Sequence, residues 1–102
     1  MTFNEYQSHT AHLAFYPQPD ITYTVLGLCG EAGEVAEKHK KRLRDGTFDK
    51  VAMLKELGDV LWYVQACAME LGSSLEEVAE MNIEKLRQRQ ERGTQRGSGD
   101  DR

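Results

Sequence analysis

The sequence predicts an all-α chain of four helices that assembles with further copies of itself into an oligomeric helical bundle. Apolar residues recur at spacings of three and four through four stretches, which is the pattern of amphipathic helices. The stretch 49–71 is apolar around most of its circumference, so it must be covered from several directions. A chain of 102 residues forms one core and has too few helices to supply that cover. We therefore expect a dimer or tetramer in which helices of neighbouring subunits pack together.

The chain is predicted to form one domain over residues 1–92, followed by a tail. Residues 93–102 contain no apolar side chain, so they cannot bury surface and are expected to be disordered. The first helix is predicted to begin at Phe3, because Thr2 and Glu5 have the spacing of a capping box. The prolines within residues 16–19 then impose an extended backbone.

The second helix is predicted over residues 21–44, with Asp20 as its cap. Gly27, Gly30 and Gly33 recur every three residues inside it, and each costs up to about 1 kcal/mol relative to alanine. The pattern indicates either a loop or poor helix, or a close approach by another backbone or a ligand. It is neither the dinucleotide nor the P-loop pattern, because no Gly-Lys-Ser/Thr follows and no strand precedes.

The remaining boundaries follow from turn and capping chemistry. Residues 45–47 form a turn, and Asp49 caps the central helix, which Gly72 ends. Ser73 or Ser74 caps a fourth helix over residues 75–92. The central helix is predicted to bury one face, composed of Leu54, Leu57, Leu61, Val64, Ala68 and Leu71.

Composition limits the possible functions. The net charge of −4 argues against nucleic acid as the main partner, because phosphate binding needs a basic surface. No apolar run approaches the about 20 residues that span a bilayer, so no membrane partner is expected. Cys29 and Cys67 lie in apolar helical patterns without a signal peptide before them, so we expect reduced, buried thiols in a cytoplasmic protein.

Two acidic pairs, Glu31 with Glu34 and Glu56 with Asp59, carry the predicted chemistry. Residues three apart on a helix project side by side. Two helices joined by a short turn pack antiparallel, and both pairs lie at a similar distance from that turn. The four carboxylates should therefore converge, and their repulsion calls for cations. All-oxygen ligation favours Mg²⁺ or Mn²⁺, and carboxylate-bound Mg²⁺ commonly binds phosphate oxygens too, which predicts phosphorylated substrates.

Three stretches of the chain, GLCGEAGEVAEKHKK, KELGDVLWYV and EEVAEMNIEKLRQR, resemble the MazG-type all-α nucleoside triphosphate pyrophosphohydrolases. The hallmark of that family is E-x-x-E, a spacer and E-x-x-D, and the resemblance covers about residues 3–90. It implies a metal-dependent hydrolysis of nucleoside or deoxynucleoside triphosphates to monophosphate and pyrophosphate, usually as a house-cleaning activity. It also implies self-association.

The resemblance also implies roles for individual residues. By position, the metal ligands would be Glu31, Glu34, Glu56 and Asp59. Asn82 and Lys85 match the N-x-x-K of the last helix, which is expected near the substrate. Independently of the resemblance, Trp62 and Tyr63 are candidates to stack on the base, although for Trp62 a place in the core is the more common alternative.

The mechanism predicted from these residues places magnesium ions between the acidic cluster and the triphosphate, with a water in line with the α-phosphorus. Glu31 or Glu34 accepts the proton of that water. Lys38, Lys85 or Arg89 steadies the pyrophosphate leaving group.

Rival functions make different predictions. A di-iron carboxylate bundle would carry E-x-x-H pairs, which neither acidic position has. A non-catalytic helical interaction module would show no stabilisation by magnesium and nucleotide, whereas an enzyme would. A regulator that binds nucleotides without cleaving them would release no pyrophosphate.

Overall fold

The computed structural model describes residues 1–14, 16, 20–93 and 96–100. These residues form helices and connections without a strand, so the all-α prediction is confirmed. The elements are α1 (Phe3–Thr10), a 3₁₀ turn η1 (Ala11–Leu13), α2 (Ile21–Asp45), α3 (Lys50–Glu70) and α4 (Leu75–Arg92). The prolines that were expected to end the first helix lie outside the described residues, and that helix already ends at Thr10.

Capping side chains set the helix starts, as the sequence predicts. The caps are Thr2 for α1, Asp20 for α2, Asp49 for α3 and Ser74 for α4. Each accepts a hydrogen bond from a backbone N–H of the first turn, which satisfies a donor that has no partner inside the helix. Of the two serines that could cap α4, the structure uses Ser74, which accepts from the Glu77 N–H.

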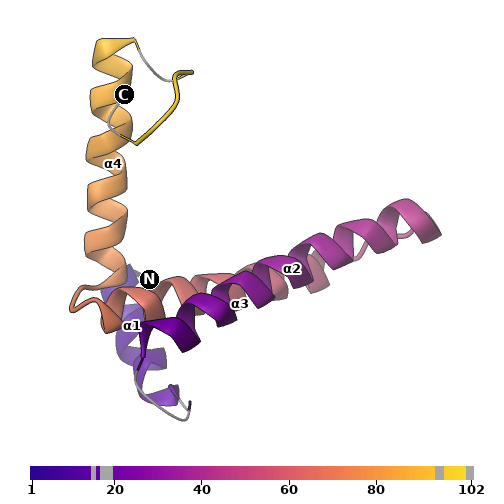
Figure 1. Cartoon of the computed structure of the whole chain (residues 1–102). Helices are drawn as coiled ribbons and strands as arrows, with labels where there is room; N and C mark the ends of the chain where they lie inside the picture. Colours follow the sequence, from indigo (N-terminus) through magenta and orange to yellow (C-terminus); the bar gives the residue numbers. More distant parts are fainter. Residues whose placement is uncertain (15, 17–19, 94–95, 101–102) are drawn as a thin grey trace.

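The helices form two arms that meet at a corner (Figure 1). One arm is the antiparallel hairpin of α2 and α3, which turns at Gly46 with a φ of 72°. The other arm is α4, which leaves the end of α3 and runs away from the hairpin, while α1 lies across the corner. The radius of gyration of 16.2 Å exceeds the about 13 Å of a compact chain of this length. The chain is therefore open rather than globular.

Polar contacts from α1 hold the corner together. The Gln65 amide of α3 donates to the Thr10 hydroxyl at 2.9 Å, and the Trp62 indole donates to the Thr10 carbonyl at 3.3 Å. On the α4 side, the Gln7 side chain accepts from the Leu75 N–H, and Asn4 donates to Glu76. Gln65 is almost completely buried, so the contact with Thr10 replaces hydrogen bonds that water would otherwise supply.

The predicted core of the central helix is largely exposed in the single chain, which corrects that expectation. Leu57 is 47% exposed and Leu71 is 72% exposed, and Leu54 is exposed as well. Of that predicted face, Ala68 is fully buried. The physical reason is the open shape, because α4 points away from the hairpin and leaves this face without a covering helix.

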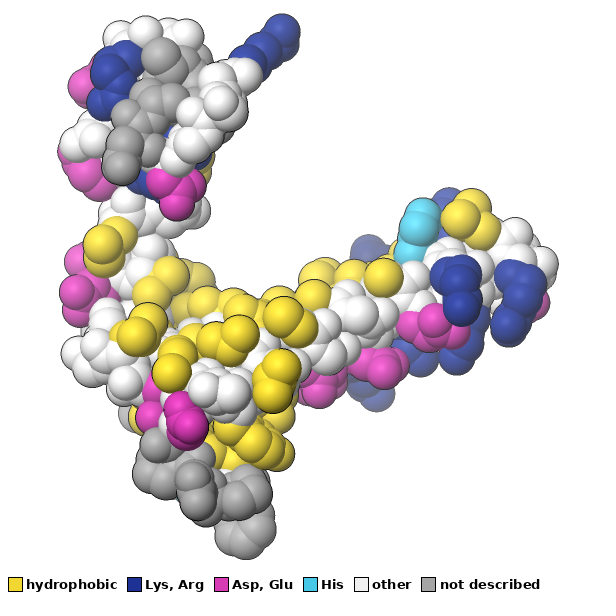
Figure 2. Space-filling model, in the orientation of Figure 1, with side chains coloured by type: hydrophobic (Ala, Val, Ile, Leu, Met, Phe, Trp, Pro, Cys, Tyr) yellow, Lys and Arg dark blue, Asp and Glu magenta, His cyan; other side chains and the backbone are white. Residues whose placement is uncertain are grey.

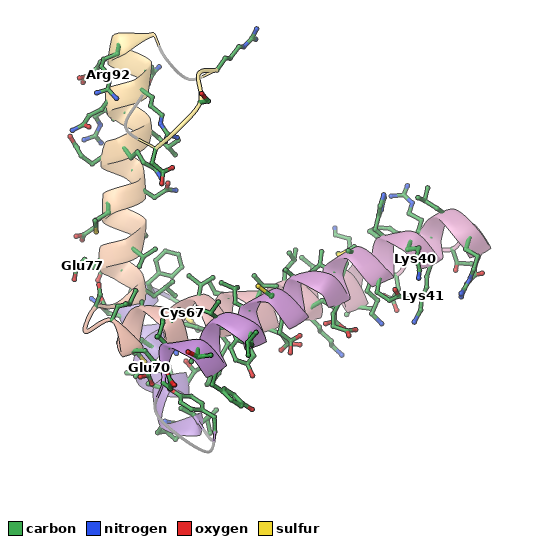
Figure 3. All side chains as sticks on the ribbon, viewed as in Figure 1. Lys40, Lys41, Cys67, Glu70, Glu77 and Arg92 are labelled. Carbon is green, nitrogen blue, oxygen red and sulfur yellow. The ribbon has the colours of Figure 1, made fainter. Side chains whose placement is uncertain are left out.

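Apolar side chains line the inner side of the angle between the two arms, and acidic side chains gather along the outer edge of the hairpin (Figure 2). The basic residues Lys40 and Lys41 lie toward the free end of the hairpin, whereas Glu70 lies at the corner (Figure 3). The charges and the apolar surface thus occupy different sides of the hairpin.

The cysteines are free thiols, but the expectation of burial is wrong for Cys29, which is exposed, while Cys67 is half-buried. Within the described residues, every helix is too short or too polar to cross a bilayer. The division into a domain of residues 1–92 and a disordered tail stays a prediction, and part of the tail (94–95 and 101–102) lies outside the described residues.

Candidate metal centre

The hairpin brings three of the four predicted metal ligands together. Glu31 projects from α2, and Glu56 and Asp59 project from α3. One carboxylate oxygen from each lies within 4.8 Å of the others. Glu31 and Glu56 are half-buried and Asp59 is exposed, so the cluster, which we call the acidic trio, opens to solvent.

Glu34, the fourth predicted ligand, lies outside the acidic trio. It follows Glu31 by three residues on α2 and is exposed. It remains close enough for its charge to raise the pKa of Glu31. The structure therefore places it at the rim of the cluster.

A close contact between α2 and α3 sets the register of the acidic trio. Gly27 lies four residues before Glu31, and Tyr63 lies four residues after Asp59, so this contact is one turn away from the trio on both helices. The Tyr63 ring packs directly on Gly27, where a Cβ atom would come within 2.1 Å of the ring. Of the alternatives that the glycine pattern left open, close approach applies at Gly27, and the approaching group is an aromatic side chain.

The other two glycines of that pattern do not share this role. An added Cβ at Gly30 or Gly33 would meet nothing within 4 Å. Both lie inside the continuous helix α2, so the loop alternative is wrong.

Burial and repulsion between the gathered carboxylates are reflected in the pKa of Glu31. Burial raises the pKa of Glu31, and the neighbouring charges of Asp59, Glu56 and Glu34 raise it further. Burial, helped by the charges of Tyr23, Glu31 and Asp59, also raises the pKa of Tyr63. A bound cation would offset this repulsion, so the donors of the trio are chemically suited to hold a metal ion.

The donor set fits a hard divalent ion. Three carboxylates from two helices supply oxygen ligands and leave further coordination positions to water or substrate, as Mg²⁺ requires. The trio contains no histidine or cysteine, which zinc would favour.

The predicted substrate-binding residues of α4 are not near the acidic trio. Asn82 is exposed, so water can satisfy its amide. Lys85 and Arg89 contact Asp100 of the C-terminal segment, with Nζ and Nη2 both 3.4 Å from its carboxylate. All three lie on the arm that points away from the hairpin.

The other two candidates lie on the hairpin. Lys38 is half-buried one turn beyond Glu34, on the side toward the basic end. Trp62 packs edge-to-face with Tyr63 and donates to Thr10 of α1, contacts that favour its structural interpretation.

Sequence reasoning missed the residues that position the site. The contact of Tyr63 with Gly27 could have been inferred from spacing. Tyr63 lies four residues after Asp59 on α3, and Gly27 lies four residues before Glu31 on the antiparallel helix α2, so the two residues fall at the same height. No spacing in the sequence indicates that Gln65 contacts Thr10 or that Glu70 contacts Tyr16, since each pair is more than 50 residues apart.

Comparisons with known proteins identify the family of the chain. The family model described as the MazG nucleotide pyrophosphohydrolase domain matches residues 20–94, which include the whole acidic trio. The chain is also similar to the Gene 37 protein of Mycobacterium phage L5, with 40% identity over 109 residues that cover 95% of this chain and 96% of that protein. No solved structure matches the chain. The family match over most of the chain shows that this protein belongs to the MazG nucleotide pyrophosphohydrolase family.

Proposed function

We propose that the protein is a magnesium-dependent pyrophosphohydrolase that cleaves nucleoside or deoxynucleoside triphosphates to monophosphate and pyrophosphate. The observation that carries the proposal is the convergence of Glu31, Glu56 and Asp59 within a chain of this family. A house-cleaning role in the cytoplasmic nucleotide pool belongs to the same proposal.

The acidic trio would hold Mg²⁺, for which Mn²⁺ can substitute. When bound, the ion neutralises charge on the phosphoryl oxygens. Glu34 lies outside the trio and keeps its carboxylate available, so we favour it over Glu31 as the acceptor of the water proton. The water oxygen bonds to the α-phosphorus, and the bridging oxygen between the α- and β-phosphorus leaves with pyrophosphate. In this proposal Lys38, one turn from Glu34 on α2, balances the charge of that leaving group.

Self-association is part of the proposal. The chain exposes 7547 Å², about 1,700 Å² more than the about 5,800 Å² expected for a folded monomer of 11.6 kDa. A dimer that covers this excess on both copies would bury about 3,400 Å², which is typical of obligate dimers. The apolar inner side of the angle supplies the surface (Figure 2).

A second copy would also bring α4 to the hairpin. In the single chain, Asn82, Lys85 and Arg89 lie on a different arm from the acidic trio. We propose that they reach the substrate from a neighbouring subunit, in a dimer or tetramer.

The test is a panel of nucleoside and deoxynucleoside triphosphates with magnesium, scored for monophosphate and pyrophosphate. Glu56→Ala should lower turnover at least about 100-fold, because it removes a metal ligand from the trio. The matched control is Glu80→Ala, which removes an exposed carboxylate of α4 and should leave turnover unchanged.

Two results would contradict the proposal. Full turnover by Glu56→Ala would remove the trio from the mechanism. A melting temperature raised by magnesium with nucleotide, without any pyrophosphate release, would identify a nucleotide-binding regulator instead.

A further inference from the structure

The upper part of α4 carries a buried cation that no other helix covers. Arg89 is 7% exposed, although Figure 1 shows only the C-terminal segment beside this part of α4 among the described residues. Burying a guanidinium costs several kcal/mol unless it is paired. Among the described residues, the group that pairs with Arg89 is the segment 96–100, which folds back along the helix.

The contacts of this segment converge on one side chain. Arg89 Nη2 donates to the backbone oxygens of Asp100 at 2.8 Å and Gly99 at 3.3 Å. The Asp100 carboxylate lies 3.4 Å from Arg89 Nη2 and 3.4 Å from Lys85 Nζ. The hydrogen bond from Lys85 holds the pKa of Asp100 below its usual range, so the carboxylate is charged at neutral pH.

These contacts leave one of the buried donors of the guanidinium without a hydrogen bond. All of them go to one nitrogen, and the buried Nε of Arg89 has no hydrogen-bond partner. A phosphate group binds arginine through two parallel N–H bonds, which would use Nε together with Nη2. A polyphosphate would thus satisfy this side chain better than the tail does.

Two of the three residues of this contact, Lys85 and Asp100, also line a pocket, whereas Arg89 does not. A pocket of about 800 Å³ extends along α4 from Phe3 and Leu75 to Lys85, and Asp100 forms part of its wall. The Lys85 ammonium and the Asp100 carboxylate therefore border the same cavity, 3.4 Å apart.

We propose that residues 96–100 are an autoinhibitory strap, in which Asp100 occupies a phosphate-binding site formed by Lys85 and Arg89. The strap and the polyphosphate of a substrate compete for the same two cations. This inference rests on the proposed function, because it takes the competing anion to be the substrate's polyphosphate.

The test measures binding of inorganic tripolyphosphate to the full chain by calorimetry, without divalent metal. Asp100→Asn removes the competing charge at nearly constant shape. If the strap is closed in about four fifths of wild-type molecules and the substitution opens it, the affinity for tripolyphosphate should rise about five-fold. The matched control is Asp45→Asn, which removes an exposed carboxylate paired with Arg44 at the far end of α2 and should change nothing. In an Arg89→Gln background, Asp100→Asn should have at most a small effect.

A second readout reports on the strap itself. Amide relaxation in solution should show residues 96–100 ordered in the wild type and mobile in Asp100→Asn or with tripolyphosphate. Equal affinities of wild type and Asp100→Asn, absence of binding in both, or mobile amides in the wild type would each overturn the proposal. Failure of the proposed function is distinguishable, because it would abolish pyrophosphate release and leave the difference in tripolyphosphate affinity intact.

Discussion

The two arms of the molecule differ in how their functional side chains are positioned. On the hairpin, the contact of Gly27 with Tyr63 fixes two helices in register, and the acidic trio converges one turn away. On α4, among the described residues, Lys85 and Arg89 form ion pairs only with Asp100 of the C-terminal segment. The comparison teaches that the single chain brings the acidic trio together by itself, whereas the cations of α4 would reach the trio only in the assembly that we propose.

The strongest test of this difference introduces a charge into the exposed apolar surface of each arm. Leu57→Asp on α3 and Leu86→Asp on α4 replace side chains that are exposed in the single chain. If a second copy covers them, each should weaken self-association by about 3 kcal/mol, or roughly 100-fold. Sedimentation at micromolar concentration measures this.

Gln90→Asp is the control, because it places the same charge on an exposed polar position of α4. A wild type that sediments as a monomer, or leucine variants that assemble normally, would show that the arms need no partner.

The second test concerns the register of the hairpin. Gly27→Ala would place a Cβ 2.1 Å from the Tyr63 ring, so the ring or the helices must move, and we expect a loss of about 1–3 kcal/mol in the free energy of unfolding. The displacement should also lower turnover, because it separates the ligands one turn away. Thermal unfolding followed by circular dichroism, together with the pyrophosphate assay, measures both effects.

Gly33→Ala makes the opposite prediction within the same helix. Its Cβ meets nothing within 4 Å, so the better helix propensity of alanine should stabilise the chain by up to about 1 kcal/mol. Equal effects of the two substitutions would mean that the contact with Tyr63 does not set the helix spacing.

The smallest expected loss of stability lies at the corner where the arms meet. Thr10→Val keeps the shape of the side chain but removes the hydroxyl that accepts from Gln65. Since Gln65 is buried and its Oε1 already lacks a partner, the free energy of unfolding should fall by about 1–2 kcal/mol. Thr22→Val, at an exposed position of α2, should stay within about 0.5 kcal/mol of the wild type. A Thr10→Val protein as stable as that control would show that the corner does not depend on this hydrogen bond.

The sequence predicted what depends on local chemistry. The caps at Asp20 and Asp49 and the helix ends at Gly46 and Gly72 all follow from neighbouring residues, and the structure confirms them. The convergence of Glu31 with the pair on α3 could also be anticipated, because a short turn fixes the relative height of two helices.

The remaining features depend on contacts between distant segments. Periodicity assigned Leu57 to the apolar face of the central helix but could not show that the single chain leaves this face exposed. The same pattern gave no sign that Gln65 is buried, since only the approach of α1 makes it so. Spacing on a helix gives direction but not reach, so it could not show that Glu34 lies outside the trio.

The way α1 closes the corner has a consequence for the order of folding. The contacts of α2 with α3 connect segments joined by a short turn, so the hairpin can form early and at little loop-closure cost. The hydrogen bonds from α1 join residues 52 to 72 positions apart, and each closes a loop of more than half the chain. We therefore expect the hairpin to form first and α1 to dock last. The amide hydrogens of α1 should then exchange with solvent before those of the hairpin.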